Sequence, residues 1–395
     1  MTRSARVCVV RQYYYPLDIR VRREVEALLQ VGYEVDVVCL RAPGELARER
    51  RGNLTVHRLP LAHDRGGAIG YVGRYGLFLA LASLVVAGLH LRRRYAMVQV
   101  HSLPDVLVLA GLFPRLTGAR LLLDLHEVMP EFFATKFGKP LRHPLVRLVA
   151  RAEQMSIRMA DRAMTCTDQM REVFVLRGAD PDKVSVLLNA ADEAVFDADR
   201  YPHQPDPAYF TLVCHGSVEE RYGLDLVVQA VHRLRDELPA LRFHVYGDGA
   251  CRQQLRALVT ELDLEDRVWF SNGFVSMEEL LQGLACADAG IVAMRRDAFR
   301  DLTQCNKMYE YLVLHLPVIS SRTRSVEASF GDEAVAYFEP GDVDDLVRVV
   351  RQLHDDPGLR RRLVTGGTHA LQPYRWAEQR RRYQRLVEEL LADVS

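Results

Sequence analysis

The chain has 395 residues, of which 49% are hydrophobic and 26% charged, and this composition excludes wholesale disorder and collagen-like repeats. Lys and Arg together number 52 and equal Asp and Glu, so the formal net charge is +0 and a polycation that coats nucleic acid is not expected. The length suits two domains better than one.

Short β-branched runs alternate with amphipathic stretches along the chain. The strands predicted in the first half are Arg6–Val10, Glu34–Leu40, Leu54–Leu59, Ala96–Val100, Arg120–Leu125 and Val184–Leu188. Those predicted in the second half are Phe210–Cys214, Leu241–Tyr246, Arg267–Phe270, Gly290–Ala293, Pro317–Ser320 and Ala334–Phe338. Continuous apolar strands separated by helices indicate parallel sheets covered on both faces. We therefore predict an α/β protein of two facing, doubly wound Rossmann-like domains, with ligands at the carboxyl ends of the strands.

The predicted domain boundary lies in the Pro-rich segment Arg200–Pro207. This divides the chain into an N-terminal Rossmann-like domain at 1–200 and a second one at 201–375. A charged amphipathic helix at 376–395 is expected to pack back on the N-terminal domain.

The longest apolar run is Leu77–Leu89, flanked by Arg74 and by three arginines at 92–94. Thirteen residues are too few to span a bilayer as a helix. Two interpretations stay open, a buried helix of the N-terminal domain or a helix on a membrane surface with its arginines on lipid phosphates. Residues 51–120 hold nine Arg against only Asp64 and Asp105, which suits an anionic surface.

The N-terminal apolar run is too short for a secretory signal, and the seven Cys are scattered without a metal-binding spacing. Both features favour a cytosolic protein with reduced thiols.

In the first half, polar residues follow the ends of three predicted strands. His126 and Glu127 come directly after Arg120–Leu125, where a His could donate to a sugar oxygen or a phosphate, or simply cap a loop. His101 follows the preceding strand in the same way. The aromatic run that contains Tyr15 and leads to Asp18 and Arg20 follows the first strand, and it could stack on a ligand or pack as a loop.

In the second half, the segment Gly216–Gly223 joins a strand to a helix, where backbone N–H groups and Arg221 could hold an anion. An ordinary turn with a surface Arg is the alternative. Lys307 is the only Lys in residues 201–395 and lies at the start of a predicted helix, a place that favours an anion. Glu310 shares its face and could bind a ribose diol, or it could form a solvated pair with Lys307.

With these residues, the chain resembles the bacterial glycosyltransferase family 4 enzymes, which are retaining transferases of the GT-B fold that use nucleotide sugars. The similarity runs over nearly the whole length. The motifs that resemble the family's acceptor domain are Asp18 to Glu24, Gly32–Val35, His101–Asp105 and Asp124–Phe133. Those that resemble its donor domain are Gly216–Gly223, Gly247–Gly249, Asn272–Val275, Asn306–Leu312 and Pro317–Ile319.

The resemblance implies roles for these residues. Arg221 and Lys307 would hold the donor diphosphate, Glu310 the ribose, and Gly273 and Phe274 would border the base. His126 would touch the transferred sugar. The implied catalytic residues are His126 and Glu127. The implied donor-binding set is Gly216, Ser217, Arg221, Gly247, Gly273, Phe274, Asn306, Lys307 and Glu310. The implied acceptor-binding set is Tyr15, Asp18, Arg20 and His101. No metal or other cofactor is implied.

Three positions in two motifs depart from the family pattern. Ser217 and Tyr222 stand where the family often has Arg and Lys, which leaves Arg221 as the substitute, and Leu302 stands where a first glutamate is common, with Asp301 beside it. The expected activity is retaining transfer of a hexose from a UDP- or GDP-sugar to a hydroxyl, in polysaccharide, glycolipid or secondary-metabolite synthesis. A nucleotide-sugar 2-epimerase and a non-catalytic nucleotide-sugar binder are the alternatives.

The expected partners are a nucleotide-sugar donor and a sugar-containing acceptor, but no nucleic acid. The expected location is the cytoplasm, with peripheral contact at the anionic inner face of the cell membrane as an open alternative.

Overall fold

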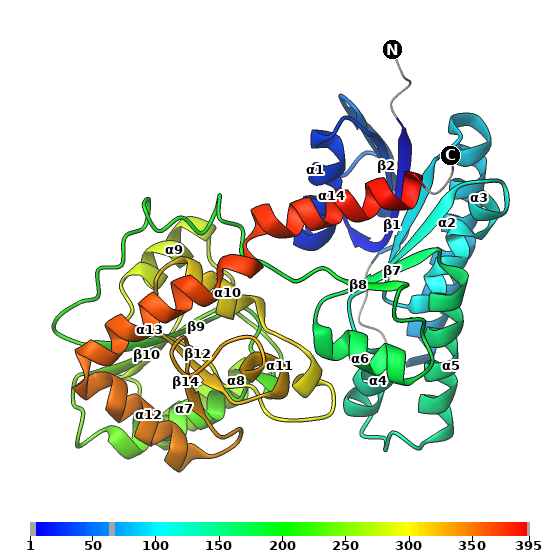
Figure 1. The fold of residues 1–395 in the computed structure, drawn as a ribbon. Coiled ribbons are helices and arrows are strands. Elements are labelled where there is room, and N and C mark those ends of the chain that lie inside the picture. Colours follow the sequence, from blue (N-terminus) through cyan, green and yellow to red (C-terminus); the bar gives the residue numbers. More distant parts are fainter. Residues whose placement is uncertain (1–4, 63–67, 393–395) are drawn as a thin grey trace. The chain divides into compact units, whose positions relative to one another are not determined.

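The chain forms two compact α/β units (Figure 1). The structure is a computed structural model that describes residues 5–62 and 68–392, with side chains omitted at 68–72. Unit 1 comprises Met1–Leu188 with Ala377–Ser395, and unit 2 comprises Asn189–Trp376.

The division falls at Leu188/Asn189 and not in the Pro-rich segment near residue 200. The segment that leads to the prolines belongs to unit 2, because Phe196 and Tyr201 pack in its core. The Pro-rich segment itself is fastened there by His203 and Gln204, which hydrogen-bond the carbonyls of Ala287 and Ala285 at 2.7 and 2.8 Å.

Unit 1 is built on an eight-stranded sheet of order β3-β4-β2-β1-β5-β6-β7-β8. Its strands are β1 (Arg6–Tyr14), β2 (Glu34–Leu40), β3 (Arg48–Arg51), β4 (Leu54–Leu59), β5 (Met97–His101), β6 (Arg120–Leu125), β7 (Arg162–Thr165) and β8 (Val184–Val186). All neighbours pair in parallel except β3, which runs antiparallel to β4 at the sheet edge. The predicted parallel sheet therefore forms, with one added antiparallel edge.

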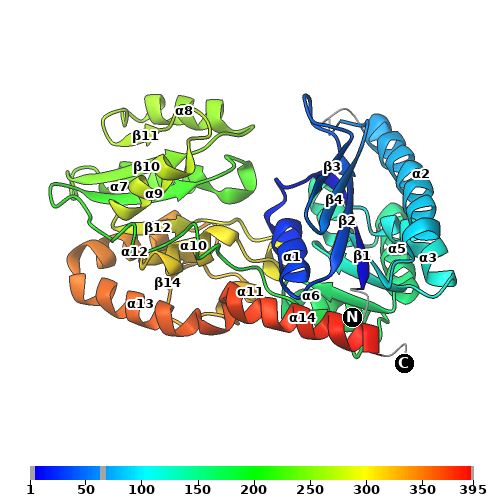
Figure 2. The same cartoon turned by 90° about the horizontal axis from the view of Figure 1, so that it is seen from above.

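Helices cover both faces of this sheet (Figures 1 and 2). One face carries α1 (Ile19–Gln30) and the C-terminal helix α14 (Trp376–Ala392), joined by a 2.9 Å hydrogen bond from Gln384 to the Ala27 carbonyl. The other face carries α2 (Ala68–Arg93), the 3₁₀ turn η1 (Asp105–Gly111), α3 (Leu112–Leu116) and α5 (Pro144–Met159). Two shorter helices, α4 (Met129–Lys136) and α6 (Asp168–Leu176), complete the unit.

Helix α2 is longer than the apolar run Leu77–Leu89 on which the sequence prediction rested. Its segment Gly73–Arg93 has 21 residues and is long and apolar enough to cross a membrane by length and composition alone, which corrects the statement that the run is too short. The run extends because Tyr75, Gly76 and His90 are uncharged and continue the helix. One face of α2 belongs to the core, since Phe78, Ala82 and Val86 are fully buried there.

Unit 2 is built on a six-stranded parallel sheet of order β11-β10-β9-β12-β13-β14. Its strands are β9 (Phe210–His215), β10 (Leu241–Tyr246), β11 (Val268–Phe270), β12 (Ala289–Val292), β13 (Val318–Ser321) and β14 (Ala336–Phe338). Its helices are α7 (Leu224–Leu234), α8 (Arg252–Glu261), α9 (Met277–Ala285), α10 (Asn306–Val313), α11 (Arg324–Glu327), α12 (Val343–Asp355) and α13 (Pro357–Ala370). Short 3₁₀ turns stand at η2 (Glu220–Tyr222), η3 (Arg300–Leu302) and η4 (Gln372–Tyr374).

Two apolar clusters cover the two faces of this sheet, one with α7, α8 and α12 and the other with α9 and α10. Both units therefore have the doubly wound, Rossmann-like architecture that the sequence predicts. In such sheets ligands bind at the carboxyl ends of the strands, so that edge of each unit is where a site is expected.

Candidate functional site

In unit 1 an ionisable cluster gathers at the carboxyl ends of β5 and β6. His101 is the last residue of β5, Asp124 lies near the end of β6, and His126 follows directly. Asp124 Oδ2 lies 3.0 Å from His101 Nδ1 and 3.1 Å from His126 Nε2. The two rings meet edge to face, with centroids 5.3 Å apart. One carboxylate thus fixes two imidazoles.

His101 Nδ1 also lies 3.1 Å from His126 Nε2, so the proton positions in this cluster depend on the tautomers of the two rings. Because a carboxylate only accepts, we assign the tautomers in which both His101 Nδ1 and His126 Nε2 carry their proton toward Asp124. His101 Nε2 then accepts from Gln99 Nε2 at 3.1 Å, and the other proton of that amide goes to Glu24 at 2.5 Å. The Gln99 carbonyl oxygen accepts from the Tyr383 hydroxyl of α14 at 2.5 Å.

This assignment leaves His126 Nδ1 as a lone-pair acceptor. Nδ1 has no hydrogen-bond partner among the residues that the structure describes, and the side chain is 14% exposed. The sequence interpretation made His126 a donor to a sugar oxygen or a phosphate. In the assigned tautomer, the Nδ1 of a neutral His126 instead accepts from a hydroxyl and does not donate to a phosphate.

The charge state of the cluster is set by two arginines. Arg20 forms a bidentate pair with Asp124, through Nε at 2.8 Å and Nη2 at 2.9 Å. Burial alone would raise the pKa of Asp124, but Arg20 and His126 hold that pKa well below its usual range. Burial first and the Arg11 guanidinium second lower the pKa of His126 to about 4. The carboxylate is therefore charged and the imidazole neutral at neutral pH.

The side chains of His101, Asp124 and His126 are close enough together to be considered as metal ligands. The three facing atoms already form two N–H to carboxylate hydrogen bonds, and Arg20 occupies both oxygens of Asp124. A cation here would also face the positive charges of Arg11 and Arg20. These residues fit a network of hydrogen bonds and ion pairs better than a metal site.

The four residues expected to bind an acceptor occupy different positions. Asp18 caps α1 by accepting from the Val21 N–H at 3.3 Å, and it pairs with Arg11 at 2.8 Å. Tyr15 is buried, and burial raises its pKa to about 12. His101 is fully buried and Arg20 is committed to Asp124, so direct contact with an acceptor is not available to either. We assign these two to positioning Asp124 and His126. Glu127 is half-buried beside His126.

In unit 2 two glycine loops at the carboxyl ends of β9 and β10 lie against each other. The N–H of Gly216 donates to the Tyr246 carbonyl at 2.7 Å, and that of Val218 donates to the Asp248 carbonyl at 2.9 Å. A Cβ on Gly247, whose φ is +150°, would lie 1.9 Å from the Gly216 carbonyl oxygen. Only glycine permits this approach, which brings the loop after β9 against the loop after β10.

Lys307 points from the first turn of α10 to this loop. A Cβ on Gly216 would lie 3.1 Å from Lys307 Cε, and Nζ lies 3.8 Å from the centroid of the Tyr222 ring. The Arg221 guanidinium lies 5.2 Å from the same centroid. The lysine is 7% exposed, yet within the described ranges it forms no ion pair with a carboxylate. Burial would lower the pKa of Lys307, but neighbouring groups, Cys214 first, raise it, so the side chain stays cationic.

Glu310 lies one turn further along α10. It faces His215 at the end of β9, with Oε2 3.1 Å from Nε2. The alternative, a solvated pair with Lys307, does not form: the Glu310 side chain is 13% exposed and faces His215. Asn306, the first residue of α10, and Ser217 are exposed at the same edge.

The loop after β11 holds the remaining donor-site residues. Gly273 has φ +74°, and Phe274 is 70% exposed. Buried Ser271 connects this loop to the one after β10, since its Oγ accepts from the Gly247 N–H at 2.9 Å and donates to the Gly273 carbonyl at 2.6 Å. The structure therefore brings Gly216, Gly247, Lys307 and Glu310 together and links Gly273 to them through Ser271.

Leu302 stands where the family commonly has a glutamate, and its neighbour Asp301 is the nearest carboxylate in the sequence. Leu302 is buried in η3, and the neighbouring Asp301 carboxylate accepts from Arg296 Nε and from the Arg324 N–H, both at 3.1 Å. Asp301 would have to leave these partners before it could replace the missing glutamate.

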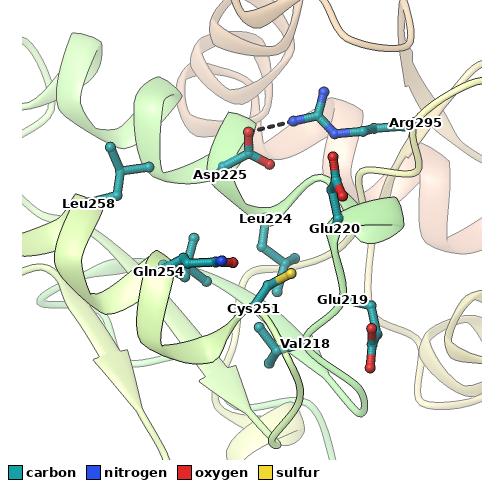
Figure 3. A pocket seen from close by; sticks show the side chains of 10 residues that line it. Val218, Glu219, Glu220, Leu224, Asp225, Cys251, Gln254, Leu258 and Arg295 are labelled. Atoms are coloured by element: carbon teal, nitrogen blue, oxygen red, sulfur yellow. Dashed lines mark hydrogen bonds and ion pairs between the residues drawn. The ribbon is translucent and has the colours of Figure 1, made fainter. Parts of the chain in front are cut away.

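A cavity of about 440 Å³ borders the same edge of unit 2 (Figure 3). Its lining residues are Val218, Glu219, Glu220, Leu224, Asp225, Cys251, Gln254, Leu255, Leu258 and Arg295. Asp225 and Arg295 pair at 2.5 Å across it, as Figure 3 shows. It shares no lining residue with the predicted donor-binding set, and its carboxylates do not suit a diphosphate.

Sequence reasoning gave no binding or positioning role to five residues of these two edges: Glu24, Gln99, Tyr383, His215 and Tyr222. The first three lie behind the histidines and come from three distant segments, which no local motif joins. His215 and Tyr222 do have a signal in the sequence, because His215 precedes the Gly216–Gly223 loop and Tyr222 lies within it, next to Arg221. The aromatic ring of Tyr222 can form a cation–π interaction with a neighbouring cation.

Comparison with known proteins matches each half of the chain to a glycosyltransferase domain. A model of the glycosyl transferase 4-like domain matches residues 18–190, and one of the glycosyl transferases group 1 matches residues 209–356. The chain is 27% identical over 360 residues to 2-deoxystreptamine glucosyltransferase of Streptomyces kanamyceticus, covering 86% of this chain and 90% of the relative.

Two solved structures share the fold. Sucrose-phosphate synthase of Thermosynechococcus elongatus superimposes with a TM-score of 0.78 at 17% identity, over 98% of this chain and 100% of that one. Anabaena HepE in complex with UDP-glucose has a TM-score of 0.70 at 14% identity, over 97% and 99% of the two chains.

The orientation of His126 predicts unequal effects of two isosteric replacements. The side-chain amide of Asn reaches the place of Nδ1, and that of Gln reaches the place of Nε2. We expect His126→Asn to retain at least about tenfold more kcat/KM for glycosyl transfer than His126→Gln, the size of one hydrogen bond in a desolvated site. Equal losses, or better retention by Gln, would place the substrate contact at Nε2.

The pKa of His126 predicts a characteristic pH profile. A neutral acceptor keeps kcat/KM constant from about pH 8 down to about pH 5, and the rate falls as the ring protonates near pH 4. Because Arg11 lowers this pKa, Arg11→Gln should raise it and move the acid limb to higher pH. The matched control is Arg22→Gln on the surface of α1. An acid limb that stays in place in Arg11→Gln, with folding checked by circular dichroism, would contradict the assignment.

Proposed function

The chain belongs to the group 1 glycosyltransferases of family 4, enzymes that transfer a sugar from a nucleotide sugar, and on this premise we propose that it moves a hexose from a UDP- or GDP-sugar to a hydroxyl with retention at the anomeric carbon. In this proposal unit 2 binds the donor and unit 1 supplies His126.

The observation that carries the proposal is the buried ammonium of Lys307. A cation at 7% exposure without a carboxylate partner is costly, and a nucleoside diphosphate would supply the missing negative charge. The partial positive charge at the N-terminus of α10 adds to the attraction for an anion. Arg221, exposed at the same loop, can fork onto phosphate oxygens.

The rest of the donor would be recognised along the same edge. Glu310 can accept from a ribose diol, and its contact with His215 fixes the carboxylate at the end of β9. Phe274, largely exposed, offers a ring on which a base can stack beside Gly273. The UDP-glucose in complex with the Anabaena protein supports a donor of this class.

The proposed chemistry is positional and electrostatic. Negative charge grows on the diphosphate as the glycosidic bond breaks, and Lys307, Arg221 and the α10 N-terminus are placed to stabilise it. Retention requires the acceptor hydroxyl to attack from the side of the leaving group, so a phosphate oxygen can take its proton. His126 Nδ1 would accept from a hydroxyl of the transferred sugar and hold the sugar ring in place.

For the acceptor we propose a sugar-containing molecule that presents a hydroxyl to unit 1, from polysaccharide, glycolipid or secondary-metabolite synthesis. The name of the Streptomyces relative supports a small polar acceptor. For the location we propose the cytoplasm, with peripheral contact at its anionic membrane face. The burial of Cys8, Cys39, Cys166 and Cys214 as free thiols is typical of a reducing compartment.

Binding of UDP and uridine tests the role of Lys307. Lys307→Met should weaken binding of UDP, or of GDP if a thermal-shift screen selects it, by about 10- to 100-fold, the value of a charge-assisted hydrogen bond. Binding of the nucleoside should stay unchanged, because it lacks the phosphates. Isothermal titration calorimetry measures both affinities, with Lys139→Met in unit 1 as the matched control. Equal UDP affinity in Lys307→Met and the wild-type chain would contradict the assignment.

Two outcomes separate the alternatives. Incubation with donor alone that yields an epimer identifies an epimerase, whereas UDP binding without turnover of any donor on cell-derived acceptors identifies a non-catalytic binder.

A further inference from the structure

Helix α2 is apolar on two opposite sides. On one side Phe78, Ala82 and Val86 are fully buried against unit 1, at the spacing of four residues that places them on one face. On the opposite side Leu77, Leu84 and Leu91 are exposed, at 48%, 71% and 60%. Their spacing of seven residues makes a straight stripe along the helix. A helix that is apolar all round is normally covered on all sides.

The exposed stripe is unusually free of charge. The sequence holds no charged residue between Arg74 and Arg92. Gly76 and Gly88 lie on the outer side, where an added Cβ would meet no atom within 4 Å. Of the most apolar 18-residue stretch of α2, only 22% is buried in the structure. At about 1.5 Å per residue the stripe is roughly 20 Å long, so it forms a patch and not an isolated leucine.

Helices α3 and α5 lie on the same face of the sheet as α2 (Figure 2). Leu116 of α3 is exposed beside α2, and η1 packs between α2 and α5. On α5, Leu145 and Leu148 are exposed. We call these six leucines, Leu77, Leu84, Leu91, Leu116, Leu145 and Leu148, the outer leucine surface.

The charges around the outer leucine surface are positive. The exposed arginines of α2 and of the α5 region are Arg92, Arg142, Arg147, Arg151 and Arg158. The only acidic residue of α5, Glu153, is fully buried and paired with Arg177 at 3.0 Å. Apolar side chains interleaved with arginines suit the boundary between acyl chains and anionic headgroups.

We propose that the outer leucine surface docks unit 1 on an anionic lipid bilayer, with α2 lying in the plane of the interface. The helix does not cross the bilayer, because its inner face is fixed to the domain. His90 on that face accepts from the Tyr95 N–H at 3.2 Å and lies 3.1 Å from the Thr117 hydroxyl. The leucines enter the acyl boundary, and the arginines bind lipid phosphates.

A second copy of the chain is the other occupant that a leucine stripe suggests, and the charges disfavour it. Two α2 helices in parallel would bring Arg92 against Arg92, and in antiparallel they would bring Arg92 toward Arg74. Like charges in contact destabilise such a dimer, whereas anionic headgroups neutralise both ends.

This inference deepens the peripheral membrane contact within the proposed function. Its test measures lipid binding without any transfer reaction. A failure of lipid binding would therefore leave UDP binding by unit 2 intact, and a failure of UDP binding would leave lipid binding intact.

Vesicle sedimentation of the full chain tests the proposal. We expect binding to vesicles of phosphatidylcholine with phosphatidylglycerol, weaker binding to phosphatidylcholine alone, and release at high salt. Leu84→Gln should lower the partition coefficient about tenfold, and Leu77→Gln/Leu84→Gln/Leu91→Gln about 100-fold or more, since each leucine leaves the acyl boundary. Arg147→Gln/Arg151→Gln should remove most of the preference for the anionic lipid.

Matched controls keep the result specific. Leu46→Gln, an equally exposed leucine outside the patch, and Arg382→Gln/Arg385→Gln on α14 should bind as the wild-type chain does. Thermal unfolding and UDP binding check that each variant is folded. Variants on α2 that bind vesicles like the wild-type chain would overturn the proposal. So would a wild-type dimer in sedimentation velocity that Leu84→Gln dissociates.

Discussion

The buried ion pair between Arg20 and Asp124 is the interaction on which unit 1 depends. It joins α1 to β6, and Arg20 Nη1 extends it by donating to the Leu187 carbonyl at 3.0 Å, where the last strand of the unit ends. The next residue, Leu188, donates its N–H to Gln379 of α14 at 3.0 Å. Removing one partner of such a pair costs about 3–5 kcal/mol because the other charge stays buried. The same pair sets the chemistry, since the Asp124 carboxylate holds both imidazoles in one tautomer.

The two units differ in how their buried charged side chains are paired. In unit 1 every charge near His126 has its partner inside the protein, and the group left open to solvent is a neutral acceptor. In unit 2 the ammonium of Lys307 is buried against a glycine loop and a tyrosine ring, and it pairs with no carboxylate of the residues that the structure describes. A neutral acceptor suits a sugar hydroxyl and an unpaired cation suits a diphosphate. These two properties are what the proposed function asks of His126 and of Lys307.

Much of this fold follows from the sequence, because parallel strands read as short apolar runs. Strands β2, β4, β6 and β10 have the predicted bounds. Two strands were not predicted. β3 consists of Arg48, Glu49, Arg50 and Arg51, which form an antiparallel edge that needs no apolar face, and β7 is too short to show a pattern. The sequence analysis counted only the apolar run Leu77–Leu89, whereas helix α2 continues beyond both ends of this run. Neutral polar residues lengthen a helix without lengthening its apolar run.

The candidate site was predictable only where its members are close in sequence. Lys307 and Glu310 share one helix turn, and the scarcity of lysine drew attention to the first. Tyr383 reaches Gln99 across 284 positions, so only the folded chain reveals the network behind His126. For the same reason His101 was assigned to acceptor binding, although the parallel sheet buries it completely.

The central claim is that Asp124 holds His126 as the neutral, Nε2-protonated tautomer. Nitrogen NMR of the chain with ¹⁵N-labelled histidine, with His126→Asn to identify the signals, tests it directly at pH 7. The account predicts a proton on Nε2 and an unprotonated Nδ1, unchanged down to about pH 5. An imidazolium at neutral pH, or a proton on Nδ1, would contradict it.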